Sequence, residues 1–302
     1  MSDGKITAID VGFGATKAMD SDGNKVCIPS EFCVYNHTSE EVRGATKYSF
    51  EGKDYIVGND VSKRRQAAQT LENVDRLIKY APLLIMAAEK KVPINGFLAV
   101  GLPLGDMSRG KELKKRVKEF YNTEVIVVPQ GFGVFEDCGF QNVIILDIGF
   151  NTLDVYVSEN GNIVKDECIS IHGQGMVSVI DPLWKHIIRK HNLPGVTIHQ
   201  VEMAIRGNNT IQKHGKLLDI KDDADTILAS WSGNLISSIR RGAWGRRLNV
   251  VEKIVVAGGG AYWFTLDDPK QFGDRLIQMK EPEFSNVRGF LKVAKNIIEK
   301  RR

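Results

Sequence analysis

The chain has 302 residues, of which 42% are hydrophobic and 26% charged, and its net charge is +4. This is the composition of an ordinary soluble globular protein, and the length predicts two domains of about 150 residues each. No apolar run reaches the roughly 20 residues that a membrane span requires, and the opening MSDGK lacks the basic and apolar parts of an export signal. We therefore expect a cytoplasmic protein with no membrane partner, whose four cysteines are free thiols.

The first predicted element is a β-hairpin that contains a glycine turn. Residues 5–10 are an apolar, β-branched run that ends in Asp10, and residues 16–20 form a second short strand. A glycine turn lets backbone N–H groups approach phosphate oxygens, because no Cβ intervenes. Asp10 is therefore a candidate Mg²⁺ ligand, and Lys17 can reach a β- or γ-phosphate as a point charge. The candidate phosphate-binding residues of this turn are Gly12, Phe13, Gly14, Ala15, Thr16 and Lys17.

Helices and strands alternate over the next stretch of chain. Apolar residues at helical spacing predict a helix over roughly Glu72–Lys91, in which Pro82 should cause a kink or mark the true start. The elements predicted after it are a strand at Phe97–Gly101, a basic amphipathic helix at Gly110–Tyr121, a strand at Glu124–Val128 and a helix at Gly131–Cys138. The last of these leads directly into a second hairpin.

This second hairpin, IILDIGFNTLD at residues 144–154, repeats the first one. Asp147 matches Asp10 and is a second candidate Mg²⁺ ligand, whereas the place of Lys17 is taken by Asp154. A cation on one wall and a carboxylate on the other suit phosphoryl transfer, because one neutralises charge and the other orients a water or hydroxyl. Two matched copies are hard to explain as coincidence. The candidate phosphate-binding residues here are Gly149, Phe150, Asn151 and Thr152.

The remaining elements continue the alternation. Helices are predicted at Met176–His191, Val201–Ile205, Asp223–Trp244 and Asn286–Ile298, and a strand at Lys253–Val256. That strand runs into Gly258, Gly259 and Gly260, where a planar base or a ribose can lie against bare backbone, and a helix should follow.

The alternation predicts an α/β protein of two domains, each a mixed sheet flanked by helices, with a nucleotide cleft between them. The predicted first domain is residues 1–152 plus 286–302, in which the last helix closes the fold, and the predicted second domain is residues 153–285.

The order of phosphate loop, connecting helix, second phosphate loop and late glycine turn resembles the ATPase superfamily of actin, the heat-shock chaperone ATPases and the sugar kinases. Within it, the chain is most similar to the bacterial plasmid-segregation actins of the ParM (StbA) group. The segments that carry the resemblance are IDVGFGATK at 9–17, VGLPL at 100–104, VVPQGFGVF at 127–135, LDIGFNTLD at 146–154 and VVAGGGA at 255–261.

The resemblance implies a role for each matching position. Asp10 would serve Mg²⁺ and Lys17 the phosphates, and Asp147 and Asp154 would flank the hydrolytic water. The adenosine would lie against Gly258–Gly260. The resemblance also implies that Gly173 and Gly175, in the turn before residue 176, lie near the ribose and phosphates.

The connecting helix departs from the family pattern. ParM-like and actin sequences carry a Glu or Gln there to position water, and this chain has Gly133. Gln130 and Glu136 lie one turn to either side and are the candidate substitutes, although a solvated helix carboxylate is an equally good interpretation of Glu136.

The function that the resemblance implies is an ATP-dependent, filament-forming ATPase that segregates plasmid or phage DNA. Its expected partners are further copies of itself and a DNA-bound adaptor, because no helix-turn-helix or other motif predicts direct sequence-specific DNA binding. The expected cofactors are ATP, with GTP left open, and Mg²⁺. Two alternatives stay open: a small-molecule kinase of the same superfamily, for which Asp106 is a candidate base, and a non-polymerising actin-like scaffold.

Overall fold

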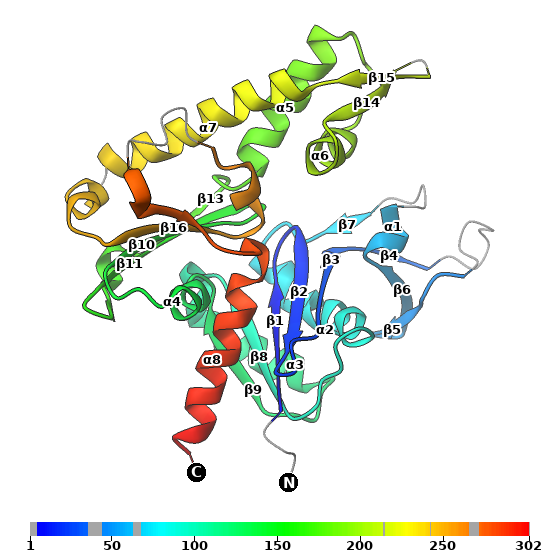
Figure 1. The fold of residues 1–302 in the computed structure, drawn as a ribbon. Helices are drawn as coiled ribbons and strands as arrows, with labels where there is room; N and C mark the ends of the chain where they lie inside the picture. Colours follow the sequence, from blue (N-terminus) through cyan, green and yellow to red (C-terminus); the bar gives the residue numbers. More distant parts are fainter. Residues whose placement is uncertain are drawn as a thin grey trace.

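The computed structural model describes residues 5–35, 44–62, 68–213, 215–241, 243–265 and 272–301. Figure 1 shows two lobes, each built on a mixed sheet with helices packed against it, which confirms the predicted fold class. Residues 1–4, 36–43, 63–67 and 302 of the predicted first domain lie outside the described residues, as do residues 214, 242 and 266–271 of the predicted second domain. Residue 242 also belongs to the predicted helix Asp223–Trp244.

The first sheet combines an antiparallel hairpin with two parallel strands. Its strand order is β3 (Lys25–Pro29), β2 (Ala15–Asp20), β1 (Ile6–Val11), β8 (Phe97–Leu102) and β9 (Val125–Pro129). Strands β1, β2 and β3 pair antiparallel, and β8 and β9 extend the sheet in parallel from β1. Strand β1 is buried along its whole length, including the polar residues Thr7 and Asp10, as its mainly apolar sequence predicts.

The second sheet repeats this topology. Its order is β12 (Asn162–Ile163), β11 (Thr152–Glu159), β10 (Val143–Ile148), β16 (Lys253–Ala257) and β17 (Leu276–Gln278), and β13 (Ile169–His172) also pairs with β11. Strands β10 and β11 are antiparallel, and β16 and β17 are parallel to β10. The predicted domain boundary after residue 152 falls within this antiparallel pair, after the first residue of β11, and it stays a prediction.

Two smaller sheets complete the strands. One consists of β5 (Tyr48–Phe50), β6 (Lys53–Val57), β4 (Glu31–Val34) and β7 (Gln69–Thr70), and the other of β14 (Thr210–Lys213) and β15 (Lys216–Asp219). The α-helices are α1 (Asn59–Ser62), α2 (Val74–Glu89), α3 (Gly110–Lys118), α4 (Phe132–Cys138), α5 (Val177–Lys190), α6 (Ile198–Arg206), α7 (Lys221–Arg241) and α8 (Ser285–Glu299).

The helix α2 shows how the sequence sets a boundary. It begins after Asn73, whose side chain accepts a hydrogen bond from the backbone N–H of Arg76 and so caps the first turn. It then continues through Pro82, which therefore does not mark its start. One face of the helix packs against the first sheet and buries residues at helical spacing, among them Leu77, Ala81, Leu84, Ile85 and Ala88.

The helix α8 and the short helix α4 lie side by side where the two lobes meet (Figure 1). Phe290 of α8 is fully buried against the first sheet, in a cluster that includes Ala8 of β1 and Ala99 of β8. The last helix of the chain thus packs on the sheet formed by the first strands.

Two other boundaries differ from the expected ones. The predicted helix Val201–Ile205 begins earlier, at Ile198, because Thr197 and Gln200 form a capping box. The glycines 258–260 are followed only by a 3₁₀ helix, Gly259–Trp263, instead of a regular α-helix. In the described part of the chain, no helix has the length and apolar character needed to cross a bilayer.

Candidate functional site

A pocket lies between the two repeated hairpins. From the first it is lined by Asp10, Gly12, Phe13, Gly14, Ala15 and Lys17, and from the second by Asp147, Gly149, Phe150, Thr152 and Asp154. Gln130 and the three glycines 258–260 also line it. The structure therefore brings together residues that are far apart in the sequence and that the repeated motif had singled out.

The two hairpins have the same turn and face one another. In the first, the backbone N–H of Gly12 donates to the carbonyl of Ala15, and in the second that of Gly149 donates to the carbonyl of Thr152. A Cβ at Gly14 would lie 2.7 Å from the Cβ of Phe150, so the loops touch across the pocket. The strand register places Lys17 opposite Asp10 and Asp154 opposite Asp147. The two walls therefore differ in one charged side chain: the first hairpin has the cation Lys17 where the second has the carboxylate Asp154.

Asp10 is almost fully buried and has two polar neighbours. Its Oδ1 accepts a hydrogen bond from Gln130 Nε2 at 2.5 Å, and its Oδ2 lies 3.8 Å from Lys17 Nζ. Burial raises the pKa of Asp10, and the Lys17 ammonium and the Gln130 amide partly offset that rise. A cation brought to this carboxylate would favour its charged form.

Asp147 and Asp154 are also buried, with exposed fractions of 5% and 2%. Burial raises the pKa of Asp147 to about 6, although Asn286 Nδ2 donates to its Oδ2 at 2.7 Å. Burial and the negative charge of Asp147 raise the pKa of Asp154 to about 7. Asp154 Oδ1 is buried and accepts no hydrogen bond from the described residues. Asp147 and Asp154 lie close together, and one oxygen of Asp154 has no hydrogen-bond donor in the described part of the chain. This part of the pocket therefore has an excess of negative charge that a cation would stabilise.

The residues that follow β9 take part in a chain of hydrogen bonds that runs along the pocket. Gln130 reaches Asp10, and the backbone N–H of the next residue, Gly131, donates to Asn286 Oδ1 at 2.9 Å. Asn286, in the first turn of α8, then donates to Asp147. One chain of hydrogen bonds therefore joins the connection before α4, the start of α8 and the second hairpin.

Some predicted residues do not line the pocket. Glu136 lies in α4, and Asn151 lies in the turn before β11, where its carbonyl accepts from Gly173 N–H. Thr16 is fully buried, and its hydroxyl lies 2.9 Å from that of Ser30. Gly175 packs behind the second loop, because a Cβ there would lie 2.6 Å from the carbonyl oxygen of Gly149. Of the two substitutes for Gly133, the pocket thus contains Gln130, not Glu136.

Six further residues line the pocket that the motifs did not indicate: Cys27, Met176, Arg206, Tyr262, Glu283 and Asn286. Tyr262 lies two residues after the glycine turn 258–260, and Met176 directly follows the turn of Gly173 and Gly175, so both could have been found from those positions. The other four come from segments with no motif, and only the tertiary fold brings them to the site.

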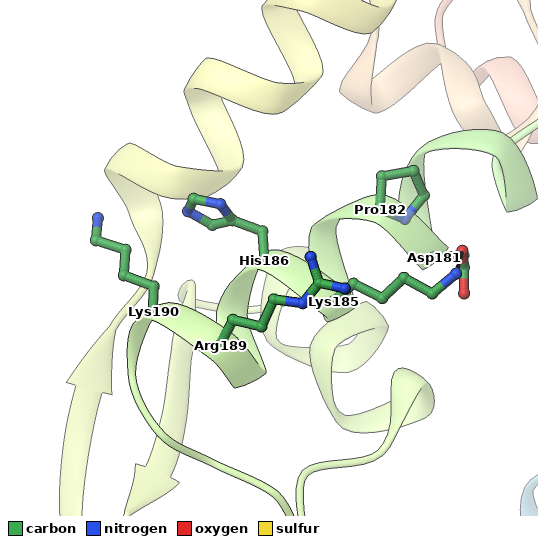
Figure 2. A pocket seen from close by; sticks show the side chains of 6 residues that line it. All are labelled: Asp181, Pro182, Lys185, His186, Arg189 and Lys190. Carbon is green, nitrogen blue, oxygen red and sulfur yellow. Dashed lines mark hydrogen bonds and ion pairs between the residues drawn. The ribbon is translucent and has the colours of Figure 1, made fainter.

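A larger hollow lies elsewhere, on α5. It has a volume of about 650 Å³, and all six of its lining residues belong to this one helix. Figure 2 shows His186 and Lys190 pointing toward α7, where both bond the buried Asp223 together with His191. Although burial opposes it, these hydrogen bonds hold the pKa of Asp223 below its usual range. The hollow is one face of a helix, and the side chains beside it secure α5 to α7.

The carboxylates of the pocket between the hairpins suit Mg²⁺, which needs few protein ligands, better than a metal ion whose ligands all come from the protein. Among the described residues, no three His, Cys, Asp or Glu side chains gather at a metal site. Mg²⁺ usually takes one or two carboxylates and completes its shell with phosphate and water. Asp10 and Asp147, one from each hairpin, supply that number of carboxylates.

Two family models match the chain, in different parts. Residues 8–133 match the N-terminal domain of actin-like proteins, and residues 145–268 match the C-terminal part of MreB-like archaeal actin homologues. The chain belongs to the actin-like superfamily. No curated protein sequence matches it.

Solved structures share the fold across nearly the whole chain. An archaeal actin homologue, Ta0583, has 21% sequence identity and a TM-score of 0.77, with 98% of this chain and 100% of that chain covered. A 15-stranded ParM filament from Clostridium botulinum has 20% identity and a TM-score of 0.76, covering 97% and 99%. A MamK double helical filament has 19% identity and a TM-score of 0.73, covering 96% and 98%. These similarities confirm the predicted resemblance in fold.

Proposed function

We propose that this protein binds and hydrolyses ATP with Mg²⁺, and that the nucleotide drives its assembly into filaments that segregate plasmid or phage DNA through an adaptor. The observation that carries the proposal is the pair of facing hairpins, whose register sets Asp10 beside Lys17 and Asp147 beside Asp154. The archaeal actin homologue with the same fold has been solved in complex with ADP, which supports a nucleotide in this pocket.

The residues of the pocket divide the binding task by their chemistry. The amides of the two glycine turns face the phosphates, and Lys17 neutralises their charge. Asp10 and Asp147 hold the Mg²⁺, which neutralises further negative charge on the phosphates. The glycine turn 258–260 accommodates the nucleoside, because it leaves the backbone uncovered there.

Asp154 is the residue we assign to hydrolysis. It faces the phosphates from the wall opposite Lys17, where direct contact between its carboxylate and a phosphate would be repulsive. Its Oδ1, which accepts no hydrogen bond from the described residues, can accept one from a water molecule. Gln130, at the pocket and bonded to Asp10, is the side chain placed to orient that water, since Glu136 does not line the pocket.

Filament formation follows from the two-walled site. A ligand that contacts both hairpins favours the conformation in which the lobes are closest, and a subunit fixed in one conformation presents a fixed surface to its neighbours. ParM and MamK, which share this fold, have both been solved as filaments.

The experiment is light scattering of the purified protein with Mg²⁺ and ATP, ADP or no nucleotide, followed by sedimentation of the same samples. Scattering that rises with ATP and decays as phosphate is released supports the proposal. A protein that binds ATP but stays monomeric at tens of micromolar would instead be a scaffold or a kinase. The adaptor is tested by isolating the filaments: recovery of a small circular DNA together with a second protein bound to them would support it.

A small-molecule kinase is the second candidate, because a second hollow adjoins the pocket. It has a volume of about 360 Å³, and its lining combines apolar residues with polar ones that include Glu31, Asn59 and Thr70. Asp106, the candidate base, does not line it. Release of ADP that depends on an added sugar would favour the kinase.

A further inference from the structure

The rim of the pocket carries a carboxylate that is separate from the three aspartates. Glu283 lies in a 3₁₀ helix, Pro282–Phe284, three residues before Asn286. This helix packs against the one that follows the glycine turn, and the backbone N–H of Gly258 donates to the carbonyl of Pro282 at 3.0 Å. Glu283 is therefore attached to the wall on which we place the nucleoside.

Glu283 is held by one hydrogen bond. The hydroxyl of Tyr262 donates to its Oε2 at 2.6 Å, and both side chains line the pocket. Its Oε1 accepts no hydrogen bond from any residue in the described part of the chain. Glu281, two residues earlier, pairs instead with Lys25 and does not line the pocket. Only one of these two neighbouring carboxylates is thus available to a ligand.

A carboxylate only accepts hydrogen bonds, so it selects a ligand group that carries donors. Phosphate oxygens carry none at neutral pH and would be repelled. A ribose carries two neighbouring hydroxyl donors, which match the two oxygens of a carboxylate. Dinucleotide-binding folds use an acidic side chain for the same group.

The position of Glu283 favours the ribose over the base. Its negative charge acts on the thiol of Cys27, and Cys27 lies directly opposite Lys17 in the register of β2 and β3. Glu283 is therefore close to the strand that carries the phosphate-binding lysine. The part of a nucleotide attached directly to its phosphates is the ribose, and the base lies beyond it.

We propose that Glu283, positioned by Tyr262, accepts hydrogen bonds from the ribose hydroxyls of the bound nucleotide and so selects ribonucleotides over deoxyribonucleotides. This inference rests on the proposed nucleotide-binding function. It identifies a specificity residue that the repeated hairpins do not contain. It also explains the Tyr262–Glu283 hydrogen bond, because this bond restricts the rotation of the carboxylate at the rim of the pocket.

The test is calorimetric titration of the full chain with ATP, 2′-deoxy-ATP, 3′-deoxy-ATP and GTP, using the wild type, Glu283→Ala, Tyr262→Phe and the control Glu281→Ala. A hydrogen bond to a charged group corresponds to about tenfold or more in affinity. We therefore expect the wild type and Glu281→Ala to prefer ATP over a deoxy-ATP by that factor. In Glu283→Ala the ratio should fall to near one, and in Tyr262→Phe it should be intermediate.

The ratio of affinities is the decisive quantity, because removal of a negative charge changes the affinity for every nucleotide by a similar factor. A ratio that is unchanged in Glu283→Ala would overturn the inference while leaving the proposed function intact. A change in the ATP-to-GTP ratio alone would also overturn it, and would assign Glu283 to the base. Absence of any nucleotide binding by the wild type would overturn the proposed function as well.

Discussion

Gly133 of α4 and Gly289 of α8 lie in direct backbone contact: a Cβ at position 289 would lie 1.7 Å from the carbonyl oxygen of Gly133. In the other direction, a Cβ at position 133 would lie 2.6 Å from the carbonyl oxygen of Asn286. There is therefore no space for a side chain at either position. This explains why the chain has glycine where the family resemblance places Glu or Gln. The close approach of α8 occupies the space, and Asn286 reaches Asp147 from the same turn of that helix.

The first prediction concerns this helix contact. Gly289→Ala should force α4 and α8 apart and lower the free energy of unfolding by about 1–3 kcal/mol or more, the usual effect of overpacking. The control is Gly233→Ala in α7, where nothing lies within 4 Å of the added Cβ. That control should be neutral or slightly stabilising, because alanine is the better helix former. Thermal unfolding of both variants checks the prediction, and equal midpoints would contradict it.

Asn286→Ala should weaken nucleotide binding more than it weakens the fold. The side chain accepts from Gly131 N–H and donates to Asp147, so its loss leaves a buried carboxylate without its donor. We expect the affinity for Mg²⁺–ATP to fall by roughly tenfold, since a hydrogen bond to a charged group is worth about 1.5–3 kcal/mol. Calorimetric titration measures this. Normal affinity in a folded variant would show that the contact does not position Asp147.

The pH dependence of stability should reveal the crowded carboxylates in the nucleotide-free protein. In the folded state the pKa of Asp154 is raised to about 7, whereas the pKa of an aspartate in the unfolded chain is about 4. Between these two pH values the folded state therefore binds more protons than the unfolded chain. Its stability therefore increases as the pH falls through this range. Asp154→Asn removes this titration and should be more stable than wild type at pH 8, with the difference shrinking toward pH 5. Melting temperatures at both pH values test this, and a variant less stable at pH 8 would refute it.

Asp154→Asn should also separate binding from hydrolysis. The carboxylate lies on the wall opposite Lys17 and makes no direct contact with phosphate in this proposal, so ATP affinity should stay near that of the wild type. Turnover should fall by about 10²-fold, a typical loss for a general-base or positioning group. Filaments of the variant should persist after wild-type filaments have decayed. Phosphate release and light scattering on one sample measure both effects, and undiminished turnover would move the catalytic role to Gln130.

The sequence predicted the parts of the site that repeat. Strands β1 and β10 are buried runs that end one residue after Asp10 and Asp147, and their pattern indicated both the strands and the places where the chain turns. The antiparallel register then follows from the hairpins, and with it the opposition of Lys17 to Asp10 and Asp154 to Asp147.

What the sequence could not predict depends on contacts between distant segments. Asn286, Arg206 and Glu283 reach the pocket only because α8, α6 and the turn before α8 pack where they do. The same holds for β17, which pairs with β16. The hairpin of β14 and β15 is local, and its turn contains Gly215 at a φ of 78°. Glu136 was a candidate because of its spacing along α4, whereas the packing of α4 against α8 decides what faces the pocket.

The most direct test of the account is the affinity of Asp10→Ala for ATP at low and at high Mg²⁺. Asp10 is the buried carboxylate that faces Lys17 in the first hairpin, and we assign it to the metal. The control is Asp22→Ala, an exposed residue in the turn of the same hairpin that pairs with Lys5. We predict that wild type and control bind ATP more tightly as Mg²⁺ rises, and that Asp10→Ala loses this dependence. Affinity that responds to Mg²⁺ equally in all three proteins would contradict the claim that the nucleotide and its metal lie between the two hairpins.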